Sequence, residues 1–581
     1  MRGNTGTIRQ NRKTGPAGGA LRRESARRRA PRAENVRTAG VRGEGGRRGN
    51  GLLTGLAFFA GALAVYKRIP LTNRIGDNGN AYFGMAYDTW LFFFLLCGYA
   101  MQAVVARMTA ARYAKGQYRN TRRVWNAALL YTAVLGIAGT AAMLLSAGVL
   151  SAGLFQTKTA AVVMRSMAPA VFISSLLGAL RGYFQGMGSM VPTAISRFVE
   201  ELAGLLLMFT LVSGMGDYGK KVGALLFQPD YEQAFGAAGA VFAFWLGGLI
   251  SLLFLALLYF LFQGSFRRRE RKDAGKGTED YRRIGRLIAG AALPVVLTGF
   301  AMQGSYILDQ ILFLQLMPAG SSSVAQWGIY TGKYRILSGI PVMLAAAACT
   351  GLIPSLSASV SGMNMGRAKE KAFFMLKLSF SVSLPLAVYL AVTADNLVPA
   401  LFTAGEMATA AGLLRIGSAA MVLQALAVGI SCVLQGLERQ RLLLGSAGIS
   451  LLLHIILMFA FLNGLKCGVE GVVYAVTGLY AAFVILGMLC VLRTLSLKGD
   501  WGRAIGIPLI SSAVMGLVVY LMNRFLAAVM SQGLLCLLCF AAGLVIYVLL
   551  MLSMRAMTQR ELKSIPGGGV FIAVGRLFRF L

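Results

Sequence analysis

The chain carries little charge for its length and has a single histidine. Of its 581 residues 14% are charged and 56% hydrophobic, and the histidine is His454. A soluble globular protein has about one-quarter charged residues. The shortage of charge therefore excludes a soluble enzyme, and the shortage of imidazoles excludes any mechanism that needs two of them.

Acidic residues are scarcer than basic ones. There are 22 Asp and Glu against 57 Lys and Arg, which gives a formal net charge of +35. In a soluble protein this excess would indicate nucleic acid, but here it lies in loops and in residues 1–50, which hold 14 Arg and Lys against 3 Glu. We expect no nucleic-acid partner. We predict that 1–50 is a disordered basic tail that either approaches anionic lipid headgroups or is simply solvated.

The sequence lacks the patterns of metal, disulfide and nucleotide sites. Its seven cysteines are an odd number and lie mostly in apolar runs, including Cys536 and Cys539. The phosphate-binding pattern of Gly, four residues and Gly-Lys-Ser/Thr is absent, so hydrolysis of ATP is not expected. We therefore predict no enzyme, no metal and no cofactor. Any energy for transport would come from the membrane potential or from a Na⁺ or H⁺ gradient.

Long apolar segments are abundant. A helix that crosses a bilayer needs about 20 mostly apolar residues. The sequence has fourteen such segments, which predicts an all-α polytopic membrane protein. The predicted spans are 51–72, 80–106, 123–147, 160–187, 191–213, 236–263, 285–317, 326–358, 371–393, 408–436, 441–463, 469–493, 503–524 and 533–555.

Basic residues between the spans lie on one side of the predicted membrane. With the N-terminus inside, the inner loops 107–122 and 264–284 are rich in arginine and lysine, whereas the outer loops 318–325 and 394–407 have none. Basic loops remain on the cytoplasmic side. We therefore expect a multi-pass protein of the plasma membrane with both termini in the cytoplasm.

Two stretches about 250 residues apart resemble each other. One span begins at Arg165 and ends with Gln185 and a glycine, and another begins at Arg415 and ends with Gln435 and a glycine. Spans 1–6 and 7–12 are therefore predicted to be parallel copies of one unit, an arrangement typical of alternating-access transporters. The predicted divisions are a tail 1–50, a first half 51–263, a basic cytoplasmic linker 264–284, a second half 285–493, two extra spans 503–555 and a cytoplasmic tail 556–581.

Charged side chains inside predicted spans cost roughly 2.5–3.5 kcal/mol each on insertion scales, so each is a functional candidate. Some have a structural explanation. Arg197 and Glu201 are four residues apart on one predicted helix and can pair. Arg181 can extend its charge to the inner surface, and a lone His454 is more typical of a hydrogen-bonded core residue than of a proton carrier. The polar intramembrane candidates are Arg181, Gln185, Arg197, Glu200, Glu201, Asp309, Gln435 and His454.

Two basic clusters fit an anionic substrate better. Arg68 and Arg74 flank Pro70, where the helix can bend, and both could turn toward a cleft or anchor at the interface. Lys333 and Arg335 lie in the eighth span beside tyrosines, and arginine forks match phosphate oxygens. These four basic residues are the predicted substrate-binding group, with a buried structural pair as the alternative for Lys333 and Arg335.

Asp88 in the second span stands at the position that matches Arg335 in the eighth span, at a repeat offset near 247. Opposite charges at equivalent positions of two halves can pair across the cleft between them. We predict that Asp88 and Arg335 form an outer gate that opens and closes during transport.

Several motifs are similar to those of one transporter family. The chain resembles the polysaccharide-biosynthesis exporters of the multidrug/oligosaccharidyl-lipid/polysaccharide (MOP) superfamily, in the branch of stage V sporulation protein B and Gram-positive MurJ-type lipid II flippases. The resemblance covers about 51–555. The motifs that carry it are Arg68–Arg74, Ala111–Gln117, Arg181–Gly188, Val191–Ser196 and Leu352–Ser357.

The resemblance implies a V-shaped bundle of fourteen helices, like that of the MATE transporters, with a cationic cavity for a pyrophosphate-linked glycolipid. By motif, Arg68 corresponds to the cavity arginine of span 1, and Lys333 or Arg335 to that of span 8. Two positions differ from the family pattern. The basic pair of span 2 is replaced by the apolar stretch Trp90–Leu96, and Asn80 stands where an acid is expected.

We therefore expect a flippase that moves an undecaprenyl-pyrophosphate-linked cell-wall precursor, with lipid II as the first candidate, from the inner to the outer leaflet. Its partners would be the lipid-linked glycan, membrane lipids and cell-wall synthesis proteins, and it would act as a monomer. Spans 13 and 14 could form a groove for the prenyl tail. The alternatives are a cation-coupled multidrug efflux transporter, a flippase for another lipid-linked polysaccharide unit, and a membrane scaffold that recruits partners through its basic tail. Roles in growth and in sporulation are both open.

Overall fold

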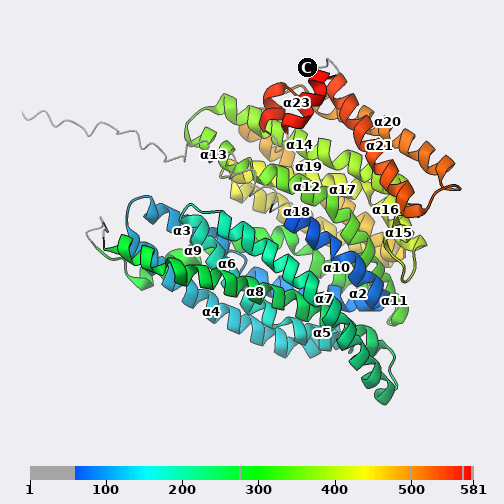
Figure 1. Cartoon of the computed structure of the whole chain (residues 1–581), viewed down its shortest axis with the longest axis horizontal. Coiled ribbons are helices and arrows are strands. Elements are labelled where there is room, and N and C mark those ends of the chain that lie inside the picture. The colour runs from blue at the N-terminus through cyan, green and yellow to red at the C-terminus, as the bar shows by residue number, and fades with distance from the viewer. Residues whose placement is uncertain are drawn as a thin grey trace, which may run out of the picture. The chain divides into compact units, whose positions relative to one another are not determined.

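The computed structural model describes residues 56, 59–271, 273, 277–497, 499–564 and 568–577 (Figure 1). The predicted basic tail 1–50 lies outside these residues. The described part of the chain is helical and contains no strand, and thirteen of its helices are long and apolar enough to cross a membrane. The prediction of an all-α polytopic membrane protein is confirmed, and the count of fourteen spans and the internal repeat remain predictions.

Seven α-helices and one π-helical turn form the first part of the described chain. They are α2 (Arg68–Cys97), α3 (Met101–Tyr113), α4 (Tyr118–Val149), the π-turn η1 (Leu150–Leu154), α5 (Ala160–Met167), α6 (Pro169–Gly186), α7 (Val191–Leu226) and α8 (Asp230–Glu270).

The second part continues to residue 495 and is followed by one π-helical turn and four α-helices. Its elements are α9 (Tyr281–Gln303), α10 (Ser305–Leu316), α11 (Ser321–Ile329), η2 (Tyr330–Tyr334), α12 (Arg335–Thr350), α13 (Ile353–Ser361), α14 (Met365–Val392), α15 (Ala394–Leu401), α16 (Ala408–Ile416), α17 (Ser418–Gly436), α18 (Gln440–Phe459), η3 (Ala460–Gly464) and α19 (Gly468–Leu495). The last are η4 (Gly502–Gly506), α20 (Ile507–Leu526), α21 (Gln532–Ser553), α22 (Gln559–Ser564) and α23 (Gly568–Leu577).

The first membrane candidate is a 55-residue helical segment, Phe59–Tyr113, which is divided at Gly76. A straight helix of that length would extend about 80 Å, far more than the ~30 Å hydrocarbon core. Gly76 has φ 66° and ψ −173°, a conformation that side-chain-bearing residues rarely adopt. This glycine therefore interrupts the helix between the predicted first and second spans.

Small residues allow neighbouring helices to approach closely. Gly239 and Gly247 of α8 contact the backbone of Leu211 and Glu200 of α7, which leaves no room for a Cβ. Small residues serve this purpose in membrane helices because lipid supplies no hydrophobic force between them. Large apolar side chains such as Leu145 and Phe260 remain exposed on the outside, as expected of surfaces that contact lipid tails.

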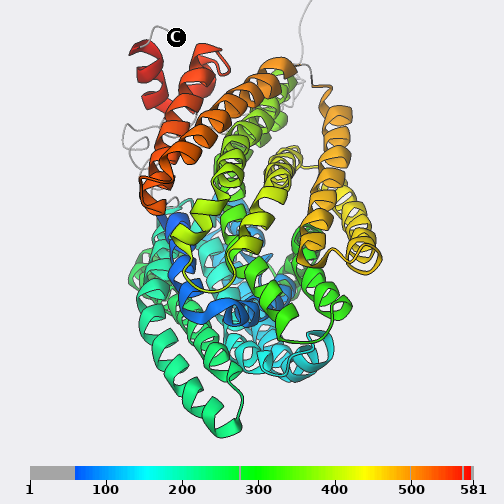
Figure 2. The same ribbon diagram turned by 90° about the vertical axis from the view of Figure 1, so that its right-hand side faces the viewer.

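Helices α20 and α21 pack against each other and against α14, and both Figure 1 and Figure 2 show them side by side. Tyr547 of α21 donates a hydrogen bond to the Ser381 carbonyl oxygen of α14 at 2.7 Å. Tyr389 of α14 donates one to the Cys536 carbonyl oxygen of α21 at 2.9 Å. These contacts attach the predicted extra spans to the second half.

The basic segment 264–284 between the two predicted halves is helical at its start and is held by hydrogen bonds near its end. Helix α8 continues to Glu270, into the segment 264–284 predicted as a linker. Near the start of α9, Glu279 accepts hydrogen bonds from Arg112 at 3.0 and 2.5 Å, and this guanidinium lowers the pKa of the Glu279 carboxyl. The Asn120 side chain accepts a hydrogen bond from the Glu279 backbone N–H.

Candidate functional site

A cavity of about 270 Å³, which we call the central cavity, lies between residues of the two predicted halves. The first half supplies one wall, from the helix before α2, from α2 itself and from α7 and α8, and the second half supplies residues of η2 and α12. The cavity contains three cations and two carboxylates. Its lining residues are Ala64, Lys67, Arg68, Phe83, Gly84, Tyr87, Asp88, Glu201, Phe244, Thr331, Arg335 and Ile336.

Asp88 and Arg335 form a forked ion pair across this cavity. Arg335 Nη1 donates to Asp88 Oδ2 at 2.6 Å and Nη2 donates to Oδ1 at 2.9 Å. Asp88 has no exposed side-chain surface, whereas one-fifth of Arg335 is exposed. The guanidinium also lies 4.4 Å from the ring centre of Tyr306. The predicted pairing is confirmed, and the role of the pair as a gate stays a prediction.

A π-helical turn places Arg335 in the cavity. Residues Tyr330–Tyr334 form this turn, and Arg335 begins α12 directly after it. A π-turn rotates the residues that follow it relative to a regular α-helix. Lys333 and Arg335 are separated by one residue and yet lie in different surroundings, and only Arg335 lines the cavity.

Arg68 is the cavity cation with unused hydrogen-bonding capacity. Its guanidinium lies 4.3 Å from the ring centre of Phe83. Its Nη1 is buried and has no hydrogen-bond partner among the described residues. A buried donor without an acceptor is unfavourable, so this atom is suited to an acceptor that a ligand brings.

Lys67 is a cavity residue that sequence reasoning missed. Its Nζ lies 2.5 Å from Glu201 Oε2. The signal was available, because Lys67 is a charged residue inside the predicted span 51–72, directly before Arg68. Glu201 therefore pairs with Lys67 and not with Arg197, the partner that the spacing on its own helix permits.

Arg181 and Glu200 form a second ion pair inside the first half. Arg181 Nη2 donates to Glu200 Oε2 at 2.6 Å, and Arg181 Nε donates to Ser196 Oγ at 2.9 Å. Arg181 is therefore buried and paired rather than extended to the inner surface as predicted. The helical spacing of Arg197 and Glu201 permitted a local pair, but the two glutamates of α7 pair instead with Lys67 and Arg181 from other parts of the first half.

Two of the four predicted substrate-binding residues lie outside the cavity. Arg74 is exposed, and its Nη2 donates to Ser213 Oγ at 2.5 Å. Lys333 has no exposed side-chain surface, and its Nζ lies 2.7 Å from Asp77 Oδ1 and donates to the Glu406 carbonyl oxygen at 3.0 Å. Lys333 thus matches the structural alternative considered for it.

The surroundings of Lys333 form a connection between the halves on their predicted outer side, which we call the outer closure. It consists of hydrogen bonds from Thr72 to the Gly332 carbonyl oxygen, from Asn73 to the Leu401 carbonyl oxygen, and from the Glu406 backbone to Asp77. A Cβ on Gly328 would overlap the Asp77 carbonyl oxygen. The close fit at this glycine means that the outer closure tolerates no larger residue.

The single histidine is buried against a carboxylate within the second half. His454 Nε2 of α18 and Asp309 Oδ1 of α10 form a hydrogen bond, and His454 Nδ1 lies 3.0 Å from the Ala475 carbonyl oxygen of α19. Asp309 Oδ2 is buried without a hydrogen-bond partner in the described residues. His454 is therefore a bonded core residue, as the sequence favoured, and it also connects three helices through a titratable pair.

Gln185 and Gln435 line a separate cavity at the predicted inner end of the interface between the halves. None of its lining residues belongs to the central cavity. The two glutamines had been singled out only as intramembrane polar residues, and the structure brings them to one space.

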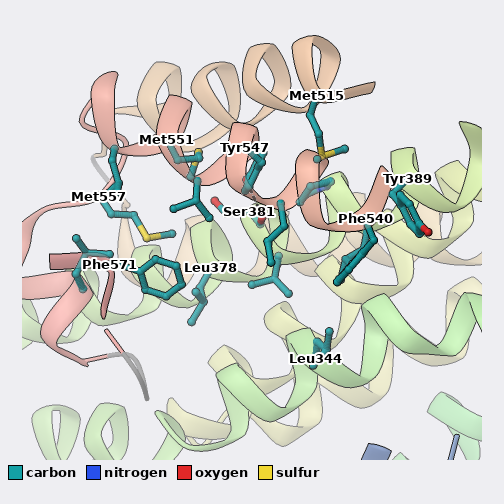
Figure 3. Close-up of a pocket in the computed structure, with 18 residues that line it drawn as sticks. Leu344, Leu378, Ser381, Tyr389, Met515, Phe540, Tyr547, Met551, Met557 and Phe571 are labelled. Carbon is teal, nitrogen blue, oxygen red and sulfur yellow. Dashed lines mark hydrogen bonds between the residues drawn. The ribbon is translucent and has the colours of Figure 1, made fainter. Parts of the chain in front are cut away.

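A third cavity, of about 350 Å³, lies between α14 and the two helices that follow the second half (Figure 3). Met557 and Phe571 lie at one end of it, and Phe540 and Tyr389 lie at the other. Its two tyrosine hydroxyls on α14 and α21 are used in the interhelical hydrogen bonds described above. The remaining surface is apolar and suited to a hydrocarbon chain. Further lining residues are Leu344, Leu378, Val382, Leu386, Met515, Leu544, Val548, Met551 and Leu562.

Known families match both parts of the chain. The family described as polysaccharide biosynthesis protein matches residues 48–360, more than half of the 581 residues. The MatE family matches residues 294–460. Two relatives come from Bacillus subtilis (strain 168). Stage V sporulation protein B is 23% identical over 511 residues, covering 87% of this chain and 94% of the relative. Lipid II flippase MurJ is 22% identical over 489 residues, covering 81% and 87%.

Solved structures have the same fold. A lipid II flippase MurJ in an inward closed conformation gives a TM-score of 0.61 at 14% identity, covering 86% of this chain and 97% of that one. A MATE family multidrug resistance transporter of the MOP superfamily, in an inward-facing conformation, gives 0.59 at 17% identity, covering 77% and 95%. These families and neighbours are transporters and flippases, not enzymes. The chain belongs to the family described as polysaccharide biosynthesis protein.

Proposed function

We propose that this protein moves a lipid-linked cell-wall precursor with a pyrophosphate group, in the first instance lipid II, from the inner to the outer leaflet. The observation that carries the proposal is the central cavity between the halves, where cations outnumber carboxylates and Arg68 Nη1 has an unused donor. Phosphate oxygens accept charge-assisted hydrogen bonds from arginine forks. One relative in Bacillus subtilis is named lipid II flippase MurJ, which agrees with such a substrate.

The geometry suggests how binding is linked to reorientation. A pyrophosphate that reaches the cavity would bond to Arg68 and compete with Asp88 for the guanidinium of Arg335. A ligand shifts a conformational equilibrium only by binding the two states with different affinity. Weakening the Asp88–Arg335 pair would remove one connection between the halves and favour the opening of the outer closure. We place both termini in the cytoplasm of a plasma-membrane protein, because the basic loops then face inward.

The prenyl tail would lie in the apolar cavity beside α14, α20 and α21. Deleting 503–555 should reduce transport of long-chain lipids more than transport of short-chain analogues, whereas equal loss would indicate a folding role. A sharper variant is Leu344→Trp, which fills the cavity. Leu509→Trp is its matched control, because Leu509 is exposed on α20 and does not line the cavity.

Transport against a gradient needs an energy source, and we propose that the buried Asp309–His454 pair couples it to an ion gradient. Histidine is the side chain that most readily exchanges protons near neutral pH. The pair connects α10 and α18, so a change in its charge would act on the packing of the second half. A proton gradient is the proposed source, and a Na⁺ gradient and the membrane potential are the alternatives.

The deciding experiment measures lipid II on the outer face of cells whose own flippase is shut off. Expression of this protein should restore labelling of outer-leaflet lipid II, and Arg68→Ala or Arg335→Ala should abolish it. Correct membrane insertion without restoration would contradict lipid II as the substrate and direct the test to other polyprenyl-linked glycans. Expression of the protein during growth or only during sporulation would then assign its stage.

A cation-coupled multidrug efflux transporter is the second candidate, because the MatE family matches residues 294–460. Cationic drugs need an available carboxylate, and in the central cavity Asp88 and Glu201 are both paired with cations. Resistance of expressing cells to cationic drugs, lost in Asp88→Asn, would favour this candidate. A scaffold role would instead require that transport-site variants keep function while removal of 1–50 abolishes it.

A further inference from the structure

A second polar cavity, of about 390 Å³, lies between the two halves near their predicted inner ends. We call it the glutamine pocket. Four glutamines line it, two from each half, and Arg107 is its one charged lining residue. Pockets that hold small molecules are typically about 300–1,000 Å³ in size. The lining residues are Tyr99, Gln102, Ala103, Arg107, Gln185, Val295, Thr298, Gly299, Met302, Gln435, Gln440 and Leu443.

The glutamine side chains have free capacity for hydrogen bonds. The amides of Gln102, Gln185, Gln435 and Gln440 bond to no other residue in the described part of the chain, and all four lie at the cavity surface. Each amide offers two donors and an acceptor. Sugar hydroxyls and acetamido groups also donate and accept, so four uncharged amides suit them better than they suit a phosphate or a cation.

The position of the pocket agrees with the predicted internal repeat. Gln185 is the penultimate residue of α6 and Gln435 is the penultimate residue of α17, and these are the positions that the predicted repeat makes equivalent. They lie on opposite halves and line one cavity. Because both halves build the pocket, it exists as a unit only while their inner ends have this arrangement.

We propose that the glutamine pocket is a loading subsite that recognises the uncharged hydroxyl- and amide-bearing glycan of the substrate. This proposal rests on the proposed function and names its second recognition element. The central cavity binds the pyrophosphate, and the glutamine pocket binds sugar from the cytoplasmic side. When the outer closure opens and the halves reorient, their inner ends move together, so the pocket narrows and releases the glycan.

The test compares a lipid that carries the glycan with its attached peptide and a lipid that carries neither. Binding of lipid II and of undecaprenyl pyrophosphate, which has no sugar, is measured on the purified full-length protein. The variant is Gln185→Met with Gln435→Met, which keeps side-chain length and removes the amides. Gln532→Met is the matched control, because Gln532 is exposed at the start of α21 and does not line the pocket. Each lost hydrogen bond should weaken binding roughly 5-fold.

The expected result is a dissociation constant for lipid II about 10- to 30-fold higher in the double variant, with unchanged binding of undecaprenyl pyrophosphate. The unchanged binding also demonstrates that the variant is folded. Equal weakening for both lipids, or no weakening for lipid II, would overturn the subsite while leaving the proposed function intact. A wild-type protein that binds neither lipid would overturn the proposed function itself, and the subsite with it.

Discussion

Asp88 and Arg335 lie 247 residues apart and are joined by two parallel hydrogen bonds of 2.6 and 2.9 Å. The pair bridges the predicted halves at the wall of the central cavity, where Asp88 is fully buried. A carboxylate in this position depends on its partner, because a buried charge without one is strongly unfavourable.

Charge reversal tests this dependence. Asp88→Arg and Arg335→Asp should each abolish transport, since either change leaves like charges together at a cost of roughly 3–5 kcal/mol. The swapped double variant restores opposite charges and should recover part of the outer-leaflet labelling of lipid II. Equal loss in the single and double variants would remove the gate from the mechanism.

Arg68 and Arg74 provide a matched pair of variants. Arg68→Ala should weaken binding of undecaprenyl pyrophosphate about 10- to 100-fold, the range expected for lost charged hydrogen bonds. Arg74→Ala should change it little, because Arg74 is exposed and bonds to Ser213 away from the cavity. Arg68→Lys should recover part of the affinity, since lysine keeps the charge and loses the fork. Equal effects of the two alanine variants would exclude Arg68 as the phosphate ligand.

The sequence predicted the fold well because lipid imposes simple rules on it. Apolar runs of about 20 residues follow from the thickness of the bilayer, and the all-α membrane architecture follows because lipid requires every backbone hydrogen bond to be made within the helix. The predicted repeat offset near 247 also indicated Asp88 and Arg335 as partners, and the structure joins them by two hydrogen bonds.

The partners of the other charges could not be predicted in the same way. Glu201 forms an ion pair with Lys67 rather than with Arg197, and the buried Lys333 forms one with Asp77. In both pairs the partners are far apart in the sequence. Which charged residues pair depends on which helices are in contact and on how deep in the membrane each charge lies. The π-helical turn before Arg335 adds a rotation that a regular helical pattern does not contain. Sequence reasoning therefore identified the charged residues better than it assigned their roles.

The outer closure depends on a glycine contact. Gly328→Leu should force α11 away from α2, because even a Cβ there would overlap the Asp77 carbonyl oxygen. We expect faster amide hydrogen exchange in residues 72–80 and 328–334 of the variant, measured by mass spectrometry. Gly339→Leu is the control, since nothing lies near its Cβ position. Unchanged exchange in Gly328→Leu would mean that the closure is not rigid at this point.

The link between Arg112 and Glu279 predicts a dependence of stability on pH. The pKa of Glu279 in the folded protein is lowered by Arg112, so the stabilisation is present above the unfolded pKa, near 4.3, and is lost as the pH falls through the folded value. Glu279→Gln should lower stability by about 1 kcal/mol or less at pH 7. The difference from the wild type should shrink as the pH is lowered below the unfolded pKa. Melting temperatures in detergent check both points, and a pH-independent difference would contradict the role of the carboxylate charge.

We expect the buried pair of His454 and Asp309 to couple transport to a proton gradient. In liposomes, an imposed proton gradient should change the transport rate of the wild type about 5-fold or more, because protonation alters the charge of a pair that joins α10 and α18. His454→Gln can still bond to Asp309 but cannot titrate, so it should transport at a rate that the gradient does not affect. A Na⁺ gradient of the same size serves as the comparison. Persistence of the proton effect in His454→Gln would assign coupling to another group, and a response to Na⁺ alone would replace the proton as the coupling ion.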